Sequence, residues 1–299
     1  MYNNTFKYYC RNRFRHKICD SIQKIPSCDG IIQQIMHIVI ISEYLSSERY
    51  IVERIRHEFQ HTTVVIPDYS PENGAVTNTY FAGQIKINSL IQRVYDKLYR
   101  IKLARKMSIE KSGNNASTSL DFLRVRLNTA TGIETIQNLE PDILITCTAP
   151  IIDDKLTQIA KIASWNIHYG IAPYYRGNHT LFWSLYFDDF EKIGGCIHQL
   201  SKGVDKGNII AEVYPALAPG DTELEIEVKV ARLLADTVVN LLHHLIESDQ
   251  SPTGTIQSES GRNFKRVERT LGKVSNQLIK QLLRKPSIPY RESKVIQHY

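Results

Sequence analysis

The sequence of 299 residues lacks any apolar run long enough to cross a membrane. Its longest apolar run, around His37–Ile41, is far shorter than the roughly 20 residues that span a bilayer. No apolar stretch follows the basic N-terminus, so no secretory leader is expected. The five cysteines show no regular pairing, and three of them lie nine residues apart, too far for the close spacing of zinc ligands. We therefore expect a cytoplasmic protein without a disulfide scaffold and without a bound metal; the three widely spaced cysteines are Cys10, Cys19 and Cys28.

The positive charge is concentrated at the two ends of the chain. The net charge is +6, yet residues 1–35 carry six Lys and Arg against two acidic residues, and residues 261–299 carry ten against two. The stretch between them is therefore net negative. A protein that acts on nucleic acid usually carries its positive charge on the working surface of its main domain. We interpret the basic ends as solvated segments and expect no nucleic-acid partner and no membrane span.

Strands and helices alternate from Met36 onward. The apolar run 37–41 predicts a strand buried on both faces, as parallel sheets require. Apolar residues then recur at four-residue spacing through Phe59, which predicts a helix, and Thr62–Ile66 predicts a second strand. This order is typical of βαβ units and predicts an open, mostly parallel α/β sheet. Further strands are expected at 142–147, 164–167, 193–200 and 208–214, and further helices at 133–139, 153–162, 179–187 and from Thr222 onward.

The alternating pattern divides the chain into three parts. We expect a basic N-terminal extension at 1–35, a main domain at 36–250 and a short basic C-terminal extension with a helix at 251–299. Residues 67–130 are interpreted as an insertion whose helix, at about 88–106, has one apolar side and one basic side. Such a helix can bind a membrane surface or a partner, or pack on its own domain. We favour the last of these.

The most informative residues follow the strand predicted at 164–167. Residues 166–177 read NIHYGIAPYYRG, and residues 203–209 read GVDKGNI. Because residues two apart in a strand point to the same side, Asn166 and His168 can address one reacting atom together. Glycines around Asp205 allow its loop to bring the carboxylate to the imidazole. Open α/β sheets bind ligands at the carboxyl ends of their strands, where these residues fall.

An amide, an imidazole and a carboxylate suit acyl transfer without a covalent enzyme intermediate. Asn166 can donate to a carbonyl oxygen as negative charge develops on it. His168 can add a second donor or accept the proton of an attacking amine, and Asp205 can orient its ring. Taken alone, a histidine after a strand is more often structural, and G-x-D-x-G is usually only a turn. The two segments together indicate a catalytic site.

These two segments resemble the 10-formyltetrahydrofolate-dependent formyltransferases, over roughly residues 36–244. The resemblance implies a Rossmann-like sheet, Asn166, His168 and Asp205 as the catalytic triad, and 10-formyltetrahydrofolate as co-substrate. It implies that the pterin binds between two loops through largely backbone contacts. His198 also stands where the family often has histidine, and we interpret it as structural. The residues matched to the pterin loops are Pro150, Ile151, Ile152, Gly203 and Val204.

Departures from the family pattern narrow the acceptor. The segment Ser42–Ser47 has no glycine, unlike the phosphate loop of the glycinamide ribonucleotide enzymes. About fifty residues follow the long helix, too few for the β-barrel of the methionyl-tRNA enzymes, and 35 residues cannot form the regulatory domain of the formyltetrahydrofolate hydrolases. The chain is most similar to the sugar-nucleotide type, which formylates a nucleotide-linked deoxyamino sugar for surface polysaccharide.

The segment Gly261–Arg266 also resembles an aromatic and basic segment of the sugar-nucleotide type, and a homodimer is compatible with this interpretation. Two other functions stay open: formylation of methionyl-tRNA or another amine, and a non-catalytic module that binds folate or a partner. Aromatic rings and guanidinium groups suit sugar and phosphate, and the candidates for the acceptor pocket are Tyr174, Tyr175, Arg176, Asn178 and His179.

Overall fold

The computed structural model describes residues 36–69, 90–107, 122–248, 250–257, 261–283 and 287–298. The expected basic extension at 1–35, with its three cysteines, lies outside the described residues. Parts of the expected insertion, at 70–89 and 108–121, also lie outside them.

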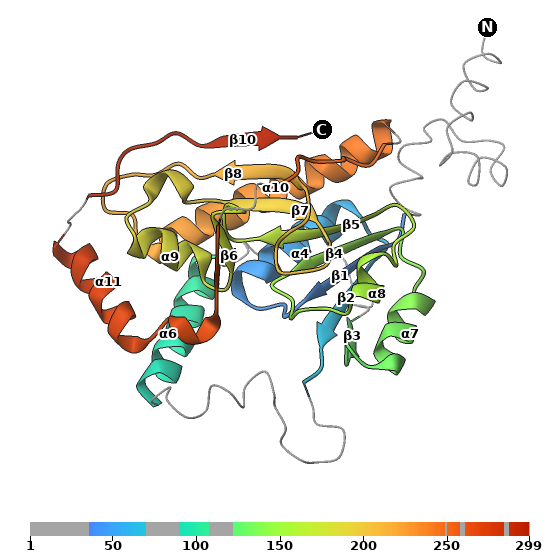
Figure 1. The fold of residues 1–299 in the computed structure, drawn as a ribbon, viewed down its shortest axis with the longest axis horizontal. Coiled ribbons are helices and arrows are strands. Elements are labelled where there is room, and N and C mark those ends of the chain that lie inside the picture. Colours follow the sequence, from blue (N-terminus) through green and yellow to red (C-terminus); the bar gives the residue numbers. More distant parts are fainter. Residues whose placement is uncertain are drawn as a thin grey trace, which may run out of the picture.

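Within the described residues, eight strands form one sheet in the order β10-β8-β7-β5-β4-β1-β2-β3 (Figure 1). From β3 to β5 all neighbours are parallel, and from β5 to β10 all neighbours are antiparallel. The expectation of an open, mostly parallel α/β sheet is confirmed. The strands are β1 (Ile38–Ser42), β2 (Thr62–Pro67), β3 (Phe122–Val125), β4 (Ile143–Cys147), β5 (Ala163–His168), β7 (Gly195–Gln199), β8 (Ile209–Tyr214) and β10 (Lys294–Gln297).

The parallel half of the sheet is covered by helices on both faces. In β1, Ile38 and Ile40 face a core that contains helices α4 (Ser46–Glu58) and α10 (Glu223–Ser248). Val39 and Ile41 face the opposite core, which contains α7 (Ala130–Asn138) and α8 (Asp154–Thr157). Successive strand residues point to opposite faces, so an uninterrupted apolar run is what a strand between two helical layers requires. Thr222 begins α10 with a capping box, in which its backbone N–H donates to Glu225 and its hydroxyl accepts from the Glu225 N–H.

Helix α6 (Leu90–Lys106) packs on its own domain beside α4 and α10. Leu103 and the adjacent Met107 contact Val228 and Ala231 of α10 in one buried cluster. The Tyr99 hydroxyl donates to Glu227, also on α10, at 2.8 Å. Of the interpretations that the sequence left open for this helix, packing within the domain is the one that the described contacts support. Among the helices of the described segments, none combines the length and the apolar character needed to cross a bilayer.

The chain after α10 returns to the domain in several places. Strand β9 (Arg262–Phe264) pairs in parallel with β6 (Tyr175–Gly177) as a small second sheet, and β10 adds an edge strand to the main sheet. Between them lie the short helix η2 (Arg266–Glu268) and helix α11 (Leu271–Leu283). Helix α9 (Thr180–Tyr186) packs against this region through aromatic side chains. A further short helix, η1, spans Phe190–Lys192.

Several elements differ from the expectations. Strand β3, which the sequence analysis placed within the insertion, belongs to the main sheet as its edge strand. Only Val125 of its four residues is fully buried, so it lacks the apolar run of a central strand. Helix α8 is four residues long rather than ten. The segment after residue 250 contains β9 and β10 as well as a helix.

Candidate active site

Three polar side chains form a row across the centre of the main sheet. Strand pairing places Thr146 of β4 opposite Asn166 of β5, and Asn166 opposite His198 of β7. The Thr146 hydroxyl donates to Asn166 Oδ1 at 2.6 Å, and Asn166 Nδ2 lies 2.9 Å from His198 Nε2. Because His198 Nδ1 faces the Gln199 carbonyl oxygen at 2.8 Å and must donate to it, Nε2 is free to accept from Asn166. The row therefore fixes which atom of the Asn166 amide is nitrogen.

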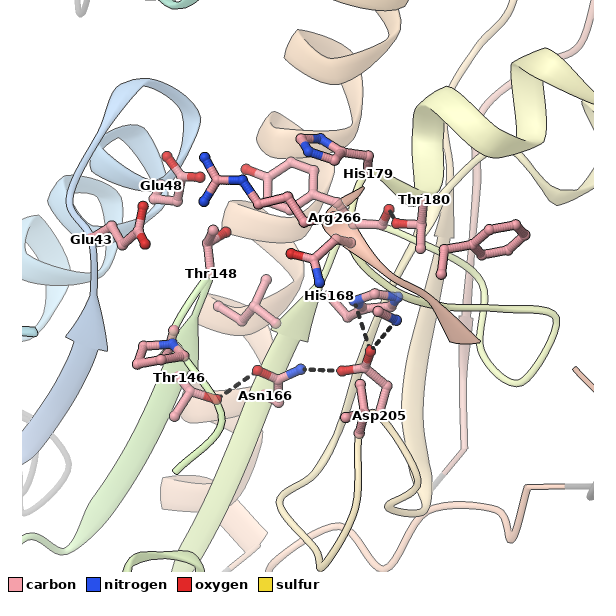
Figure 2. A pocket seen from close by; sticks show the side chains of 18 of the residues that line it. Glu43, Glu48, Thr146, Thr148, Asn166, His168, His179, Thr180, Asp205 and Arg266 are labelled. Atoms are coloured by element: carbon pink, nitrogen blue, oxygen red, sulfur yellow. Dashed lines mark hydrogen bonds and ion pairs between the residues drawn. The ribbon is translucent and has the colours of Figure 1, made fainter. Parts of the chain in front are cut away.

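The loop between β7 and β8 brings the Asp205 carboxylate to this row (Figure 2). Asn166 Nδ2 donates to Asp205 Oδ1 at 3.2 Å, and His168 Nδ1 lies 3.5 Å from Oδ2. The backbone N–H of Gly177, the last residue of β6, donates to Oδ2 at 2.8 Å. His198 Nε2 lies 3.4 Å from Oδ1. Asn166 and His168 thus both contact the Asp205 carboxylate, which is the arrangement that the expected triad requires.

The Asp205 carboxyl is held in its ionised form. Burial on its own raises the pKa of this group, but opposing contacts, of which the charge of His168 is the largest and the N–H of Gly177 is another, hold the pKa well below its ordinary value. Its side chain is 12% exposed, so this charge lies largely inside the protein. A fixed negative charge beside an imidazole stabilises the imidazolium, which is the arrangement needed for proton transfer.

The hydrogen bonds of Asn166 and His168 differ from the expectation in one respect. His168 Nε2 donates to the Tyr175 carbonyl oxygen at 2.8 Å, and Nδ1 faces Asp205. The Asn166 amide nitrogen is directed to Asp205 and His198. Donation to a reacting carbonyl therefore requires one of these side chains to exchange a partner. Such rearrangement is common, since catalytic hydrogen bonds often take their final geometry only when substrate is bound.

A cavity of about 570 Å³ opens beside the triad (Figure 2). Its volume lies within the range of small-molecule sites. One part is formed by the loops after β4 and β7, and all five residues that the sequence analysis matched to the pterin loops line it. They are Pro150, Ile151, Ile152, Gly203 and Val204.

Two of the five expected acceptor residues line the cavity and three do not. Asn178 and His179 line the cavity. Burial and the nearby arginines, Arg269 first among them, hold the pKa of His179 well below its ordinary value. The cavity lining does not include Tyr174, Tyr175 or Arg176. Their side chains have other partners, because Lys192 covers the Tyr174 ring, the Tyr175 hydroxyl donates to Asp189, and Arg176 donates to the Gly261 carbonyl oxygen.

The other part of the cavity has a mixed charged wall that the sequence analysis did not identify. Helices α4 and α10 contribute carboxylates, and α6 and the segment around η2 contribute arginines. In Figure 2 the guanidinium of Arg266 extends toward Glu48 across this space. Apart from Lys265 and Arg266, which lie in the segment Gly261–Arg266, these residues belong to no motif. The charged residues of this wall are Glu43, Glu48, Glu223, Glu227, Arg100, Lys265, Arg266 and Arg269.

Glu227 carries a carboxyl group that is partly protonated at physiological pH. Burial, followed by the charge of Glu48, raises its pKa to about 7, although Tyr99 and Ser47 donate hydrogen bonds that oppose this shift. These bonds measure 2.8 Å from the Tyr99 hydroxyl and 2.9 Å from the Ser47 hydroxyl. The folded protein therefore holds a proton on Glu227 at pH values where the unfolded chain has released it.

The raised pKa of Glu227 predicts how the stability of the fold depends on pH. The folded pKa of Glu227 is raised, so its carboxyl group costs no stability below its unfolded pKa, near 4.5. Its cost grows as pH rises from there to about 7 and stays constant at higher pH. Glu227→Gln should therefore raise the free energy of unfolding at pH 8 by on the order of 2 kcal/mol, and by much less at pH 5. Urea denaturation at both pH values measures the difference.

Glu225→Gln, on the same helix, is the matched control. The Lys106 ammonium lowers the pKa of Glu225 to about 2, so its charged form favours the folded state and its neutralisation should not stabilise the protein. Equal gains for the Glu227 variant at pH 5 and pH 8 would show that its carboxyl group does not titrate as described.

Comparison with known proteins places the chain among formyl transferases. The Formyl transferase family model matches residues 84–242, more than half of the chain. The chain is 28% identical over 124 residues to a methionyl-tRNA formyltransferase of Desulforamulus reducens, a match that covers 40% of this chain and 37% of that protein. It thus spans little more than a third of the length of this curated relative.

Solved structures share the fold at low sequence identity. A sugar N-formyltransferase from a Shewanella species aligns with a TM-score of 0.53 and 16% identity, covering 83% of this chain and 89% of that chain. A Mycobacterium tuberculosis protein, thought to be a sugar N-formyltransferase, aligns with a TM-score of 0.52 and 16% identity, covering 82% and 86%. Among the described residues, no group of three or more His, Cys, Asp or Glu side chains is arranged to hold a metal ion.

Proposed function

Because the chain belongs to the formyl transferase family, we propose that it transfers the formyl group of 10-formyltetrahydrofolate to a primary amine of a small acceptor. The observation that carries this proposal is the meeting of Asn166, His168 and Asp205 at the edge of a cavity formed partly by the predicted folate loops. Their chemistry suits the reaction without a covalent enzyme intermediate.

Each member of the triad has a distinct role in this proposal. The unprotonated amine attacks the formyl carbon, and Asn166 donates to the formyl oxygen as it becomes negative. His168 accepts the proton that the amine loses, becoming an imidazolium, and donates it to the folate nitrogen as the bond from that nitrogen to the formyl carbon breaks. Asp205 stays ionised and stabilises the imidazolium of His168.

The acceptor proposed is a nucleotide-linked deoxyamino sugar, of the kind used for surface polysaccharides. Arginines from two separate segments, Arg100 of α6 and Arg266 of η2, line the part of the cavity away from the folate loops. Guanidinium groups suit a diphosphate. The segment Ser42–Ser47, which leads into α4, contains no glycine, so it does not offer the backbone N–H cradle that a ribose phosphate would need. Two proteins of the same fold are described as sugar N-formyltransferases, one of them provisionally.

A folate-release assay with a panel of acceptors tests the proposal. We expect turnover of 10-formyltetrahydrofolate with amino-sugar nucleotides, and rates at least tenfold lower with glycinamide ribonucleotide and with methionyl-tRNA. Turnover with methionyl-tRNA, with an affinity that falls steeply as salt increases, would replace the sugar by tRNA as acceptor. Folate binding without turnover of any amine would instead support a binding module.

A pair of variants locates the acceptor within the cavity. Arg266→Gln should raise KM for the nucleotide sugar about tenfold or more, by loss of a charge-assisted contact to phosphate, and leave KM for the folate unchanged. Lys155→Gln, on α8 and outside the cavity lining, is the control and should change neither value.

A further inference from the structure

The segment that follows α10 is hydrogen-bonded to the beginning of β8. Thr255 exchanges two backbone hydrogen bonds with Ile209, each 2.8 Å long. The Asn208 side chain donates to the Thr253 carbonyl oxygen at 3.0 Å, and the Gln199 side chain donates to the Pro252 carbonyl oxygen at 3.2 Å. The two backbone hydrogen bonds fix the position of the next residues, which lie beside the loop that carries Asp205.

Gln257, two residues after this attachment, holds that loop through its side-chain amide. Its Nε2 donates to the backbone carbonyl oxygens of Asp205, at 2.8 Å, and of Gly207, at 2.6 Å. Both partners can only accept, so the amide nitrogen is the atom that faces the loop. The Oε1 atom is buried and has no hydrogen-bond partner among the described residues. Among the described residues, the polar atoms of this side chain therefore bind only the loop that carries Asp205.

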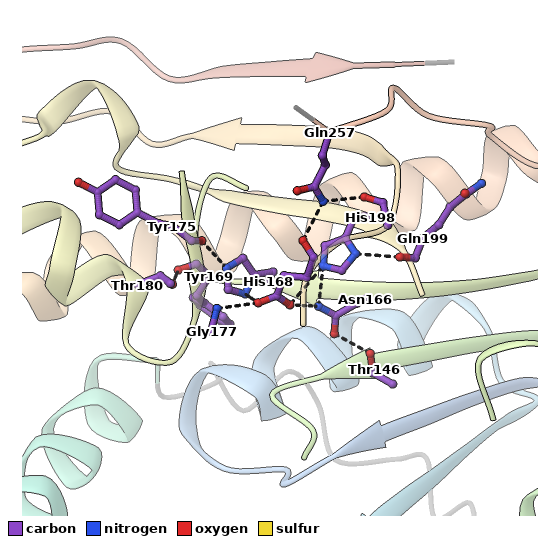
Figure 3. A network of polar contacts seen from close by, with 12 residues as sticks. Thr146, Asn166, His168, Tyr169, Tyr175, Gly177, Thr180, His198, Gln199 and Gln257 are labelled. Carbon is purple, nitrogen blue, oxygen red and sulfur yellow. Dashed lines mark hydrogen bonds and ion pairs between the residues drawn. The ribbon is translucent and has the colours of Figure 1, made fainter. Parts of the chain in front are cut away.

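The loop needs such support because its backbone is unusual. Asp205 adopts a left-handed conformation with φ of 49°, which a residue with a side chain rarely takes, and Gly203 has φ of 98°. The N–H of Gly177 and the other triad residues contact the Asp205 side chain, and Gln257 donates to the Asp205 carbonyl oxygen. Figure 3 shows Gln257 and Gly177 on different sides of this network of contacts. Asp205 is thus fixed from two directions by residues of different segments.

We propose that Gln257 is a positioning residue, which sets the Asp205 loop for both the triad and the folate. The inference rests on the proposed function for its kinetic consequences. The loop contains Gly203 and Val204, which line the predicted folate part of the cavity, as well as the carboxylate that faces His168. One side-chain amide thereby couples the placement of the co-substrate to the placement of the triad carboxylate.

Two substitutions separate the hydrogen bonds of Gln257 from its volume. Gln257→Leu removes both donors, and Gln257→Glu places a carboxylate against two carbonyl oxygens. Each variant should lower kcat by ~10–100-fold at pH 7.5, because small displacements of catalytic groups are costly, and should weaken binding of tetrahydrofolate about tenfold. Lowering the pH to 5.5 should restore much of the tetrahydrofolate binding of the Glu variant, since its protonated form can donate again, and none of that of the Leu variant.

Asn208→Leu is the matched control, because it removes an amide donor between the same two segments without touching Asp205 and leaves both backbone hydrogen bonds between Thr255 and Ile209 in place. It should retain kcat and tetrahydrofolate binding within about threefold of the parent. Hydrogen exchange of the Gly177 N–H, which donates to Asp205, gives a readout independent of activity. Faster exchange at Gly177 is expected in both Gln257 variants and not in the control.

The outcomes distinguish the inference from the function on which it rests. Unchanged exchange at Gly177 in the Gln257 variants, or kinetic losses no larger than those of Asn208→Leu, would overturn the positioning role. Faster exchange at Gly177 in the Gln257 variants, together with a parent protein that neither binds tetrahydrofolate nor transfers formyl, would support the positioning role and contradict the proposed function instead.

Discussion

Asp205→Asn should lower kcat for formyl transfer by at least ~10²-fold while leaving the protein folded. The substitution keeps the shape of the side chain and removes the negative charge that faces His168 at 3.5 Å. It also places an NH2 group, which can only donate, next to the N–H of Gly177 or the amide nitrogen of Asn166, which are donors themselves. Single-turnover rates with 10-formyltetrahydrofolate, together with circular dichroism, measure both parts of this expectation.

Asp189→Asn is the control for a lost carboxylate near β6. Asp189 accepts from the Tyr175 hydroxyl at 3.0 Å and does not line the cavity, so its loss should leave kcat within about threefold of the parent. A rate for Asp205→Asn close to that of the control would remove Asp205 from the proposed mechanism, and His168 would then need another source of stabilisation for its charged form.

Phe264→Ala should lower the free energy of unfolding by ~3–5 kcal/mol, the usual cost of deleting a large buried aromatic ring. Phe264 is 2% exposed, and its ring stacks on Trp183 with the centroids 4.9 Å apart and on Tyr175 at 5.6 Å. It belongs to β9, which pairs with β6, so the loss should also loosen the strand whose Gly177 holds Asp205. Urea denaturation gives the stability, and the folate-release assay should show a parallel loss of rate.

Phe187→Ala supplies the comparison within the same aromatic cluster. Its ring lies 6.1 Å from that of Phe264 but is 47% exposed, so its removal creates little cavity and should cost less than ~1 kcal/mol. Similar losses for both variants would mean that the cluster is not the buried core described above.

The sequence predicts the main sheet well because its central strands are apolar runs between amphipathic helices. The elements that it does not reveal are short or exposed at an edge. In β3 only Val125 is fully buried, and β10 carries exposed residues along most of its length. Strand β9 has three residues and is defined by its pairing with β6, a partner far away in the chain. Local patterns carry no information about such partners.

The clustering of Asn166, His168 and Asp205 could be predicted because these residues sit in two compact segments of recognisable order. The row of Thr146, Asn166 and His198 could not be predicted, because it depends on strand order and register. His198 lies within contact distance of Asn166 and Asp205, and its interpretation as a structural residue stays a prediction. The charged wall could not be predicted for the same reason, since Glu48, Glu227 and Arg266 come from three separate elements and only Arg266 lies in a segment that the sequence singles out.

The position of the chain after α10 has a consequence for redesign. The Formyl transferase family match ends at residue 242, but Gln257 and Phe264 lie beyond it and support the residues that hold Asp205. The same stretch supplies Arg266 to the cavity wall. If Arg266 contacts the acceptor and Gln257 positions Asp205 as proposed, exchanging this tail with that of a homologue to alter which amine is accepted would also lower the reaction rate. A chimera that preserves Gln257 and Phe264 should change the acceptor without this loss of rate.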